Sequence, residues 1–280
     1  MDKKSAFFDL HWEHILFSKI FPLLEWKDLF HLGSVSTMGR SCMDQYFSTL
    51  KEIEILGSFS AFAFQRVFRN CTKLKVLRLR KHCDWVDDAS LSQLFTTNKE
   101  LQEADLSGCS NLNGTCVHRL VFGCKGLKVL GLSGCNWVTP QSIELVMTHL
   151  TELERVDFSL CKSINNELLG HFIMRFGRLK RIKLAFMPAV NDATLLLISR
   201  SCPNLTHVDV SACGVTDHGI KSVAEYCKSL QSLKVRYCRG VTEASLRSLR
   251  IRGTVEIDQS ATSNNNWGDR SSGLGIRVQV

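Results

Sequence analysis

One pattern recurs seven times at a nearly constant step and constrains the fold more than any other feature. In each copy, a leucine is followed three and five residues later by apolar side chains. The copies begin at Leu74, Leu101, Leu127, Leu153, Leu179, Leu205 and Leu230, and the steps between them are 27, 26, 26, 26, 26 and 25 residues. In the third copy, Leu130 and Leu132 alternate with a glycine, which predicts a short strand with one buried face. Thr139 and Pro140 then suit the start of a helix, as N-cap and first helical residue.

A strand and a helix repeated at this period predict a leucine-rich-repeat solenoid, because one such unit cannot bury its apolar side without neighbours. This is an α/β fold in which a curved parallel sheet lines the concave face and helices cover the convex face. We place it at residues 50–258, from a degenerate first strand at 50–55 to a short closing strand at 255–257. Further helices are expected to start near Asp87, Gly114, Asn165, Asn191, Asp217 and Thr242.

Ten of the twelve cysteines occupy two columns of the repeat. One column follows the strands and the other precedes the first leucine by three residues; they hold Cys83, Cys109, Cys135, Cys161, Cys213 and Cys238, and Cys71, Cys124, Cys202 and Cys227. Met187 takes the first column's position in the fifth repeat. Thiols placed in this way are expected to be buried structural groups. No Cys-x-x-Cys or His-Glu-x-x-His pattern occurs, so we expect no metal site and no cofactor.

Composition narrows the classes of function. The formal net charge of +8 is moderate, and we expect no nucleic-acid partner. The first five residues lack an apolar signal core, and no apolar run approaches the roughly 20 residues that a membrane helix needs. We therefore expect a cytoplasmic protein without a membrane partner. No phosphate-binding loop or nucleophile elbow is present, so we expect no catalytic residues.

Residues 7–49 do not follow the repeat. They are apolar, are interrupted by Pro22 and Gly33, and predict two or three short helices. Such a segment can cap one end of the solenoid, or it can offer apolar surface to a partner.

The order of residues in this segment resembles an F-box. It contains Leu-x-x-Glu at Leu10 and Glu13, then apolar helices, then Asp28-Leu29, then Val35-Ser36. His11 stands where the family pattern usually has proline. Joined directly to cysteine-containing repeats, the segment makes the whole chain resemble F-box and leucine-rich-repeat proteins.

The resemblance implies a substrate-recognition subunit of an SCF-type (cullin-RING) E3 ubiquitin ligase. The F-box would bind the Skp adaptor and, through it, cullin and RING subunits, and ubiquitin transfer would belong to those other subunits. The implied adaptor-binding residues are Leu10, Glu13, Ile15, Leu16, Ile20, Leu24, Leu29 and Val35. The repeats would hold a protein substrate, which the resemblance extends to a HECT-type ubiquitin ligase of BMP signalling. The alternative is a non-ligase scaffold or inhibitor that uses only the repeats to bind a protein.

The concave face is the expected site for that protein partner. Its charged positions between buried apolar residues carry both signs, which favours a protein over a phosphate backbone. Aromatic residues just after the strands add candidates, since aromatics are enriched at binding hot spots. The predicted substrate-binding set is Trp85, Asp105, Trp137, Asp157, Lys183, Phe186, Asp209, Lys234 and Tyr237. For the two tryptophans, packing over the neighbouring repeat is an equal alternative.

The last stretch, residues 259–280, is polar and contains glycine up to Gly275, so we expect a flexible tail. Its final five residues alternate apolar and polar side chains. The alternative is therefore a tail that folds back and pairs as a strand or covers the concave face.

Overall fold

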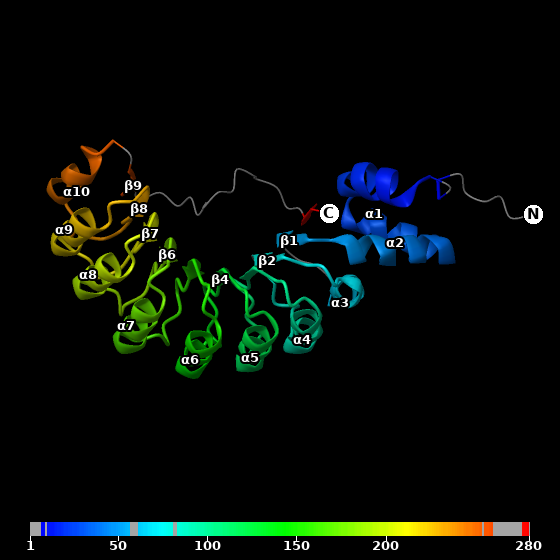
Figure 1. Ribbon diagram of the computed structural model, residues 1–280, viewed down its shortest axis with the longest axis horizontal. Helices are drawn as coiled ribbons and strands as arrows, with labels where there is room; N and C mark the ends of the chain where they lie inside the picture. Colours follow the sequence, from blue (N-terminus) through cyan, green and yellow to red (C-terminus); the bar gives the residue numbers. More distant parts are fainter. Residues whose placement is uncertain are drawn as a thin grey trace, which may run out of the picture.

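The computed structural model describes residues 7–8, 10–56, 61–80, 83–253, 255–259 and 276–279. Within them, nine parallel strands follow one another in sequence order along a curved sheet, and helices cover the outer side of the arc (Figure 1). The strands are β1 (Glu52–Leu56), β2 (Val76–Arg80), β3 (Glu103–Asp105), β4 (Val129–Gly131), β5 (Arg155–Asp157), β6 (Arg181–Lys183), β7 (His207–Asp209), β8 (Ser232–Lys234) and β9 (Glu256–Asp258). The predicted solenoid is confirmed.

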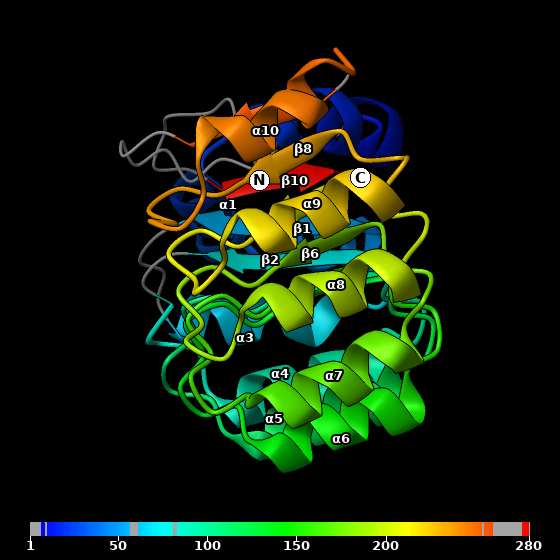
Figure 2. The same ribbon diagram turned by 90° about the vertical axis from the view of Figure 1, so that its left-hand side faces the viewer.

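One helix follows each of the strands β1 to β8, and these helices lie side by side on the convex face (Figure 2). They are α3 (Ala61–Asn70), α4 (Asp88–Thr97), α5 (Gly114–Gly123), α6 (Pro140–His149), α7 (Asn166–Arg175), α8 (Asp192–Ser201), α9 (Asp217–Tyr226) and α10 (Glu243–Arg250). From α4 to α10, each helix begins at the predicted residue or the next one. Short polar side chains explain this regularity, because a residue such as Thr139 accepts a hydrogen bond from a backbone N–H in the first turn of α6.

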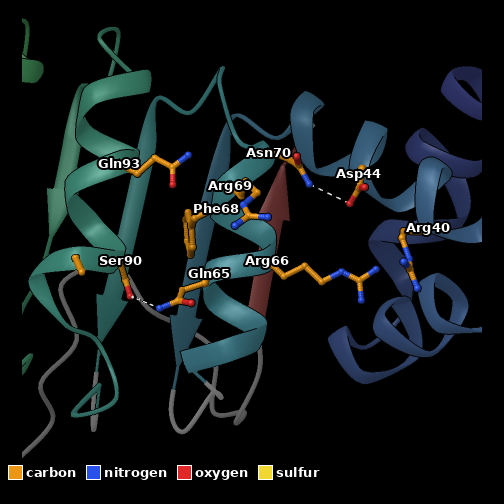
Figure 3. Close-up of a pocket in the computed structure, with 10 residues that line it drawn as sticks. Arg40, Asp44, Gln65, Arg66, Phe68, Arg69, Asn70, Ser90 and Gln93 are labelled. Atoms are coloured by element: carbon orange, nitrogen blue, oxygen red, sulfur yellow. Dashed lines mark hydrogen bonds between the residues drawn. The ribbon is translucent and has the colours of Figure 1, made fainter.

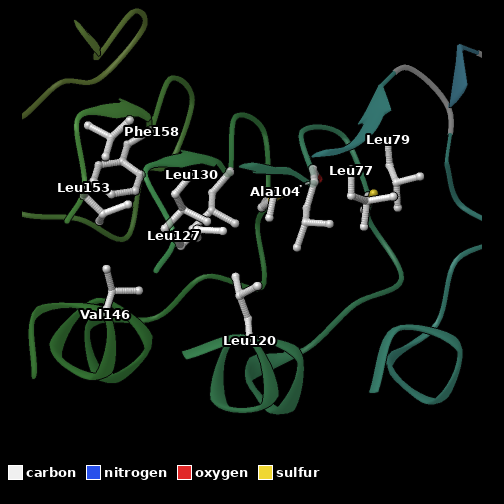
Figure 4. Packing of buried hydrophobic residues seen from close by; sticks show 14 of the residues in the cluster. Leu77, Leu79, Ala104, Leu120, Leu127, Leu130, Val146, Leu153 and Phe158 are labelled. Atoms are coloured by element: carbon white, nitrogen blue, oxygen red, sulfur yellow. Dashed lines mark hydrogen bonds between the residues drawn. The ribbon is translucent and has the colours of Figure 1, made fainter. Parts of the chain in front are cut away.

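The core runs the whole length of the solenoid between sheet and helices (Figure 4). Leu127, Leu130 and Val146 are at most 1% exposed, and they join the strand side of the core to its helix side. Each such side chain contributes roughly 1.5–3 kcal/mol on burial. Stacking therefore stabilises the fold from repeat to repeat, and the curved sheet follows from helices that are wider than the strands they back.

The column cysteines are part of this core. The thiol of Cys135 donates to the carbonyl of Leu106 at 3.2 Å, and that of Cys161 donates to the carbonyl of Leu132 at 3.0 Å. Each thiol thus satisfies a carbonyl of the preceding repeat. Burial raises the pKa of both thiols to about 12. All twelve cysteines lie among the described residues and none is in a disulfide.

Residues 12–49 form a helical cap on the first repeat. It consists of a π-helix, η1 (Trp12–Ile20), a 3₁₀ turn, η2 (Phe21–Leu23), and two α-helices, α1 (Trp26–Val35) and α2 (Thr37–Thr49). Its core is aromatic: the ring centroids of Phe21 and Tyr46 lie 5.1 Å apart, edge to face. Asn70 of α3 donates to the Asp44 carboxylate of α2 at 2.9 Å, which ties the cap to the repeats.

Four residues of the expected flexible tail form a strand instead. β10 (Ile276–Gln279) pairs antiparallel with β1, with Glu52 opposite Gln279 and Ile55 opposite Ile276. The edge of β1 offers unpaired backbone groups, which the alternating end of the chain can bond. These four residues agree with the alternative in which the tail folds back and pairs as a strand. Residues 260–275 and 280 lie outside the described residues. No helix in the described part of the chain has the length and apolarity to cross a membrane.

Candidate protein-binding site on the concave face

Alternate residues of each short strand face the concave side. In β6, Ile182 is buried, whereas Arg181 and Lys183 on either side of it are partly exposed. The register places equivalent residues of neighbouring repeats opposite one another, so each column of the repeat becomes a row across the sheet. Strands lie about 4.8 Å apart, so side chains in one row interact.

The predicted aspartates are held by the sheet itself. The carboxylates of Asp105, Asp157 and Asp209 each accept the backbone N–H two residues further on, at 3.1 Å in every case. Asp105 also pairs with Arg80 at 2.8 Å, and Asp157 pairs with Lys183 at 3.1 Å. The register sets Asp157, Lys183 and Asp209 side by side. These charges therefore neutralise one another within the protein before any partner binds.

A second row, at the first position of β5, β6 and β7, carries basic side chains. We define the basic row as Arg155, Arg181 and His207, which lie opposite one another on β5, β6 and β7. The pKa of Arg181 is lowered by burial and by the charge of Arg155. The pKa of His207 is lowered to about 4, first by burial and then by the charges of Arg181, Arg155 and Lys234. Three cations around one imidazole indicate a site with positive potential.

The basic row is not among the predicted residues, which come from the two outward positions that follow it in each repeat. The signal lay two residues after the first leucine of the fourth, fifth and sixth repeats, where Arg155, Arg181 and His207 stand.

A third row carries exposed apolar side chains on unusual backbone. We define the apolar ridge as Leu160, Phe186, Ala212 and Tyr237, whose φ angles are 65°, 58°, 55° and 59°. This left-handed conformation favours glycine, and the preceding repeats have Gly108 and Gly134 there, also with positive φ. The stacking of the repeats requires this conformation, because the backbone N–H at this position donates to a carbonyl of the next repeat. The N–H of Phe186, for example, donates to the carbonyl of Ser211 at 2.8 Å.

The apolar ridge contains two of the predicted residues, Phe186 and Tyr237, and two that the sequence analysis did not select. The side chains of Leu160, Phe186 and Tyr237 are 42%, 48% and 51% exposed. Gly108 and Gly134, at the same position of earlier repeats, were the sequence signal that could have pointed to this column. Small residues lie between the ridge and the row formed by Asp157, Lys183 and Asp209. They are Ser159, Ala185 and Ser211, each at most 8% exposed.

The two tryptophans pack against the preceding repeat. The indole N–H of Trp137 donates to the carbonyl of Cys109 at 2.6 Å, and the side chain is partly buried against the core. Trp85 meets Phe64 edge to face, with ring centroids 4.8 Å apart. These contacts support the packing interpretation for both residues, without testing a role in binding.

The predicted adaptor-binding residues of the helical cap fall into three groups. Leu16 and Leu29 are at most 1% exposed and build the cap's core, so a contact with an adaptor does not fit their position. Ile15, Ile20 and Leu24 are partly buried. Leu10, Glu13 and Val35 are exposed, and so are two apolar residues outside the predicted set, Leu23 and Met38.

A polar cavity of about 560 Å³ lies between α2, α3 and α4, away from the concave face (Figure 3). Arg40, Arg66 and Arg69 line it, and Gln65 reaches Ser90 across it at 3.5 Å. Among the described residues no cluster of histidine, cysteine and acidic side chains suits a metal ion.

Comparisons with known proteins agree with this geometry. Residues 201–224, which include β7 and most of α9, match a family described as Leucine Rich repeat. The chain is a leucine-rich-repeat protein. It is 24% identical over 165 residues to DNA repair protein rhp7 of Schizosaccharomyces pombe, covering 54% of this chain and 29% of that protein.

Among solved structures, the protein resembles a chain in the crystal structure of the Rad7 and Elc1 complex in yeast. The TM-score is 0.63 with 20% sequence identity, and the match covers 79% of this chain and 57% of the other. This likeness concerns the fold. The chain thus spans less than two thirds of the length of each of these two proteins.

Proposed function

We propose that this protein is a non-catalytic recognition subunit of a ubiquitin ligase complex, with the helical cap binding an adaptor and the concave face binding a protein substrate. The observation that carries the proposal is the apolar surface left on the cap. Leu23 is 83% exposed, Val35 77%, Met38 45% and Leu10 37%. Exposed apolar side chains of this size are typical of an interface, because water contact with them is unfavourable.

The finer assignment rests on the resemblance of the cap to an F-box. In this assignment the adaptor is Skp, which links the protein to the cullin and RING subunits of an SCF-type ligase, and these subunits transfer ubiquitin. The substrate is a protein, with a HECT-type ligase of BMP signalling as the first candidate. The Rad7 and Elc1 complex supports the general arrangement, because there a protein of similar fold is bound to a second protein.

Co-purification with a Skp adaptor tests the cap. Leu23→Asp and Val35→Asp place a charge on exposed positions, so the fold is expected to survive while adaptor binding falls by tenfold or more, since an unpaired charge in an interface is costly. Ile251→Asp is the matched control, because Ile251 is 78% exposed and follows α10 at the far end of the arc (Figure 1). Leu29→Asp is unsuitable because it places a charge in the core.

The proposal fails if the wild-type chain does not retain the adaptor, or if both cap variants retain it as well as the control does. In that event the scaffold or inhibitor alternative gains support, with the concave face as its binding surface and residues 7–49 acting only as a cap.

A further inference from the structure

The cavity between α2, α3 and α4 gathers three arginines that neither the fold nor the proposed function explains. Arg40 belongs to α2, whereas Arg66 and Arg69 belong to α3. Residues three apart on a helix are neighbours on one face, so Arg66 and Arg69 both line the cavity. Arg66 extends from α3 toward Arg40 (Figure 3). Two separate helices thus bring guanidinium groups to one space.

Arg66 is held in position by packing against the helical cap. Its guanidinium carbon lies 6.0 Å from the ring centroid of Phe30 on α1, a distance typical of a cation–π contact. Gly33 on the same helix makes room for it, because a Cβ at that position would lie 3.0 Å from Nη2 of Arg66. This Nη2 is buried and has no hydrogen-bond partner among the described residues, whereas the side chain as a whole is partly exposed. One corner of the guanidinium is therefore fixed against α1, and the remainder is accessible from the cavity.

The positive charge of the cavity is not balanced within the described part of the chain. No ion pair among the described residues includes Arg40, Arg66 or Arg69. Asp44 is the only acid among the described lining residues, and its carboxylate accepts a hydrogen bond from Asn70 at 2.9 Å. Three arginines and one aspartate leave a formal charge of +2 on this lining. Buried or partly buried charges are screened less by salt than exposed ones, so the cavity attracts anions.

We propose that this cavity binds a phosphate group between Arg40 and Arg66, with Arg69 adding to the positive potential. The planar guanidinium donates two parallel hydrogen bonds to phosphate oxygens, which makes arginine well suited to this anion. A phosphate monoester carries a charge of about −1.5 to −2 at pH 7, which matches the charge of the lining. A single carboxylate would neutralise only half of it.

The rest of the lining can hold the molecule that carries the phosphate. The cavity volume of about 560 Å³ falls within the roughly 300–1,000 Å³ of ligand pockets. The amides of Gln65 and Gln93 can donate and accept hydrogen bonds, and both side chains are exposed, so this side of the cavity is open to solvent. The phosphate can therefore belong to a phosphorylated side chain or be a free anion. The inference goes beyond the proposed function and needs neither the adaptor nor the concave face.

The probes are N-acetyl-O-phosphoserine N-methylamide and inorganic phosphate, with the unphosphorylated serine derivative and acetate as controls. Binding to the purified full chain is followed by NMR of the arginine Nε–Hε signals. We expect a phosphate probe to bind with a Kd of about 1 mM or tighter, at least about tenfold more tightly than either control, and more weakly as salt is raised. Tighter binding of the phosphoserine derivative than of inorganic phosphate identifies a phosphorylated side chain as the ligand, and equal affinity identifies the free anion.

Substitutions locate the bound phosphate. Arg40→Gln and Arg66→Gln are each expected to weaken binding by about tenfold or more, the range for hydrogen bonds to a charged group. Arg66→Lys keeps the charge but not the fork, so it should recover only part of the affinity. Arg119→Gln on α5 is the control for lost charge, since Arg119 is exposed and lies outside the cavity. Arg40 is exposed too, so its variant is expected to fold even if Arg66→Gln does not.

The proposal is wrong if neither phosphate probe shifts an arginine signal, or if the serine derivative or acetate binds equally well. It is also wrong if folded Arg40→Gln binds phosphate as tightly as the Arg119→Gln control, with circular dichroism confirming the fold of each variant. The adaptor is absent from this assay, so its outcome is independent of the ligase assignment.

Discussion

The strain in the apolar ridge can be measured with two alanines that differ in backbone conformation. Ala212 has a φ of 55°, whereas Ala185, at the position just before the ridge in the preceding repeat, is outside the positive-φ set. Substituting glycine for each removes the same methyl group. It also adds the same conformational freedom to the unfolded chain, which destabilises the native state by about 0.4–1 kcal/mol in both variants.

Because the unfolded-state contribution is the same in both variants, the difference between their free energies of unfolding measures the backbone strain at Ala212. Relief of the left-handed backbone favours Ala212→Gly by about 1–2 kcal/mol. Ala185→Gly also loses a methyl group from a residue that is only 8% exposed, worth at most about 0.8 kcal/mol. We therefore expect Ala212→Gly to be more stable than Ala185→Gly by about 1–3 kcal/mol, and at least as stable as wild type.

Urea denaturation followed by far-UV circular dichroism gives the free energies of unfolding. Equal slopes against denaturant are required for the comparison, because a changed slope indicates a changed unfolded or native state. If the two variants lose the same stability, the left-handed backbone of the ridge is not strained.

Three further predictions concern single side chains. The pKa of His207, near 4 in place of 6.5, makes the folded protein lose stability as pH falls from about 6.5 to 4 and no further below, because the unfolded state takes up the proton first. NMR titration should show that pKa rising in Arg181→Ala, and an unchanged value would contradict the electrostatic argument. Cys135 and Cys161, with pKa values about 12, should stay unmodified by a thiol reagent such as DTNB at pH 8 until the protein unfolds; modification in the native state would show them to be accessible. Trp137→Phe removes one hydrogen bond and should lower the free energy of unfolding by about 0.5–1.5 kcal/mol in urea denaturation; an unchanged value would show that this bond adds nothing to stability.

The repeat fold was predictable because its determinants are local. Each leucine pattern specifies one strand, and residues such as Thr139 and Asn165 specify where a helix starts. The helical cap was predictable as helices, but not residue by residue. Leu16 and Leu29 follow the apolar pattern as Val35 does, and only packing decides that the first two form the core while the third meets water.

The surface chemistry required the tertiary structure, because it depends on neighbours that are far apart in the chain. Arg155 and Arg181 are separated by a full repeat in sequence and lie opposite one another on adjacent strands. The same register turns Asp157 toward Lys183, so that a residue expected to bind a partner is engaged within the protein. Linear order determines which side chains each repeat contributes to the concave face. Stacking of the repeats determines which of these charges form ion pairs with one another, and which residues other than glycine must adopt a left-handed backbone.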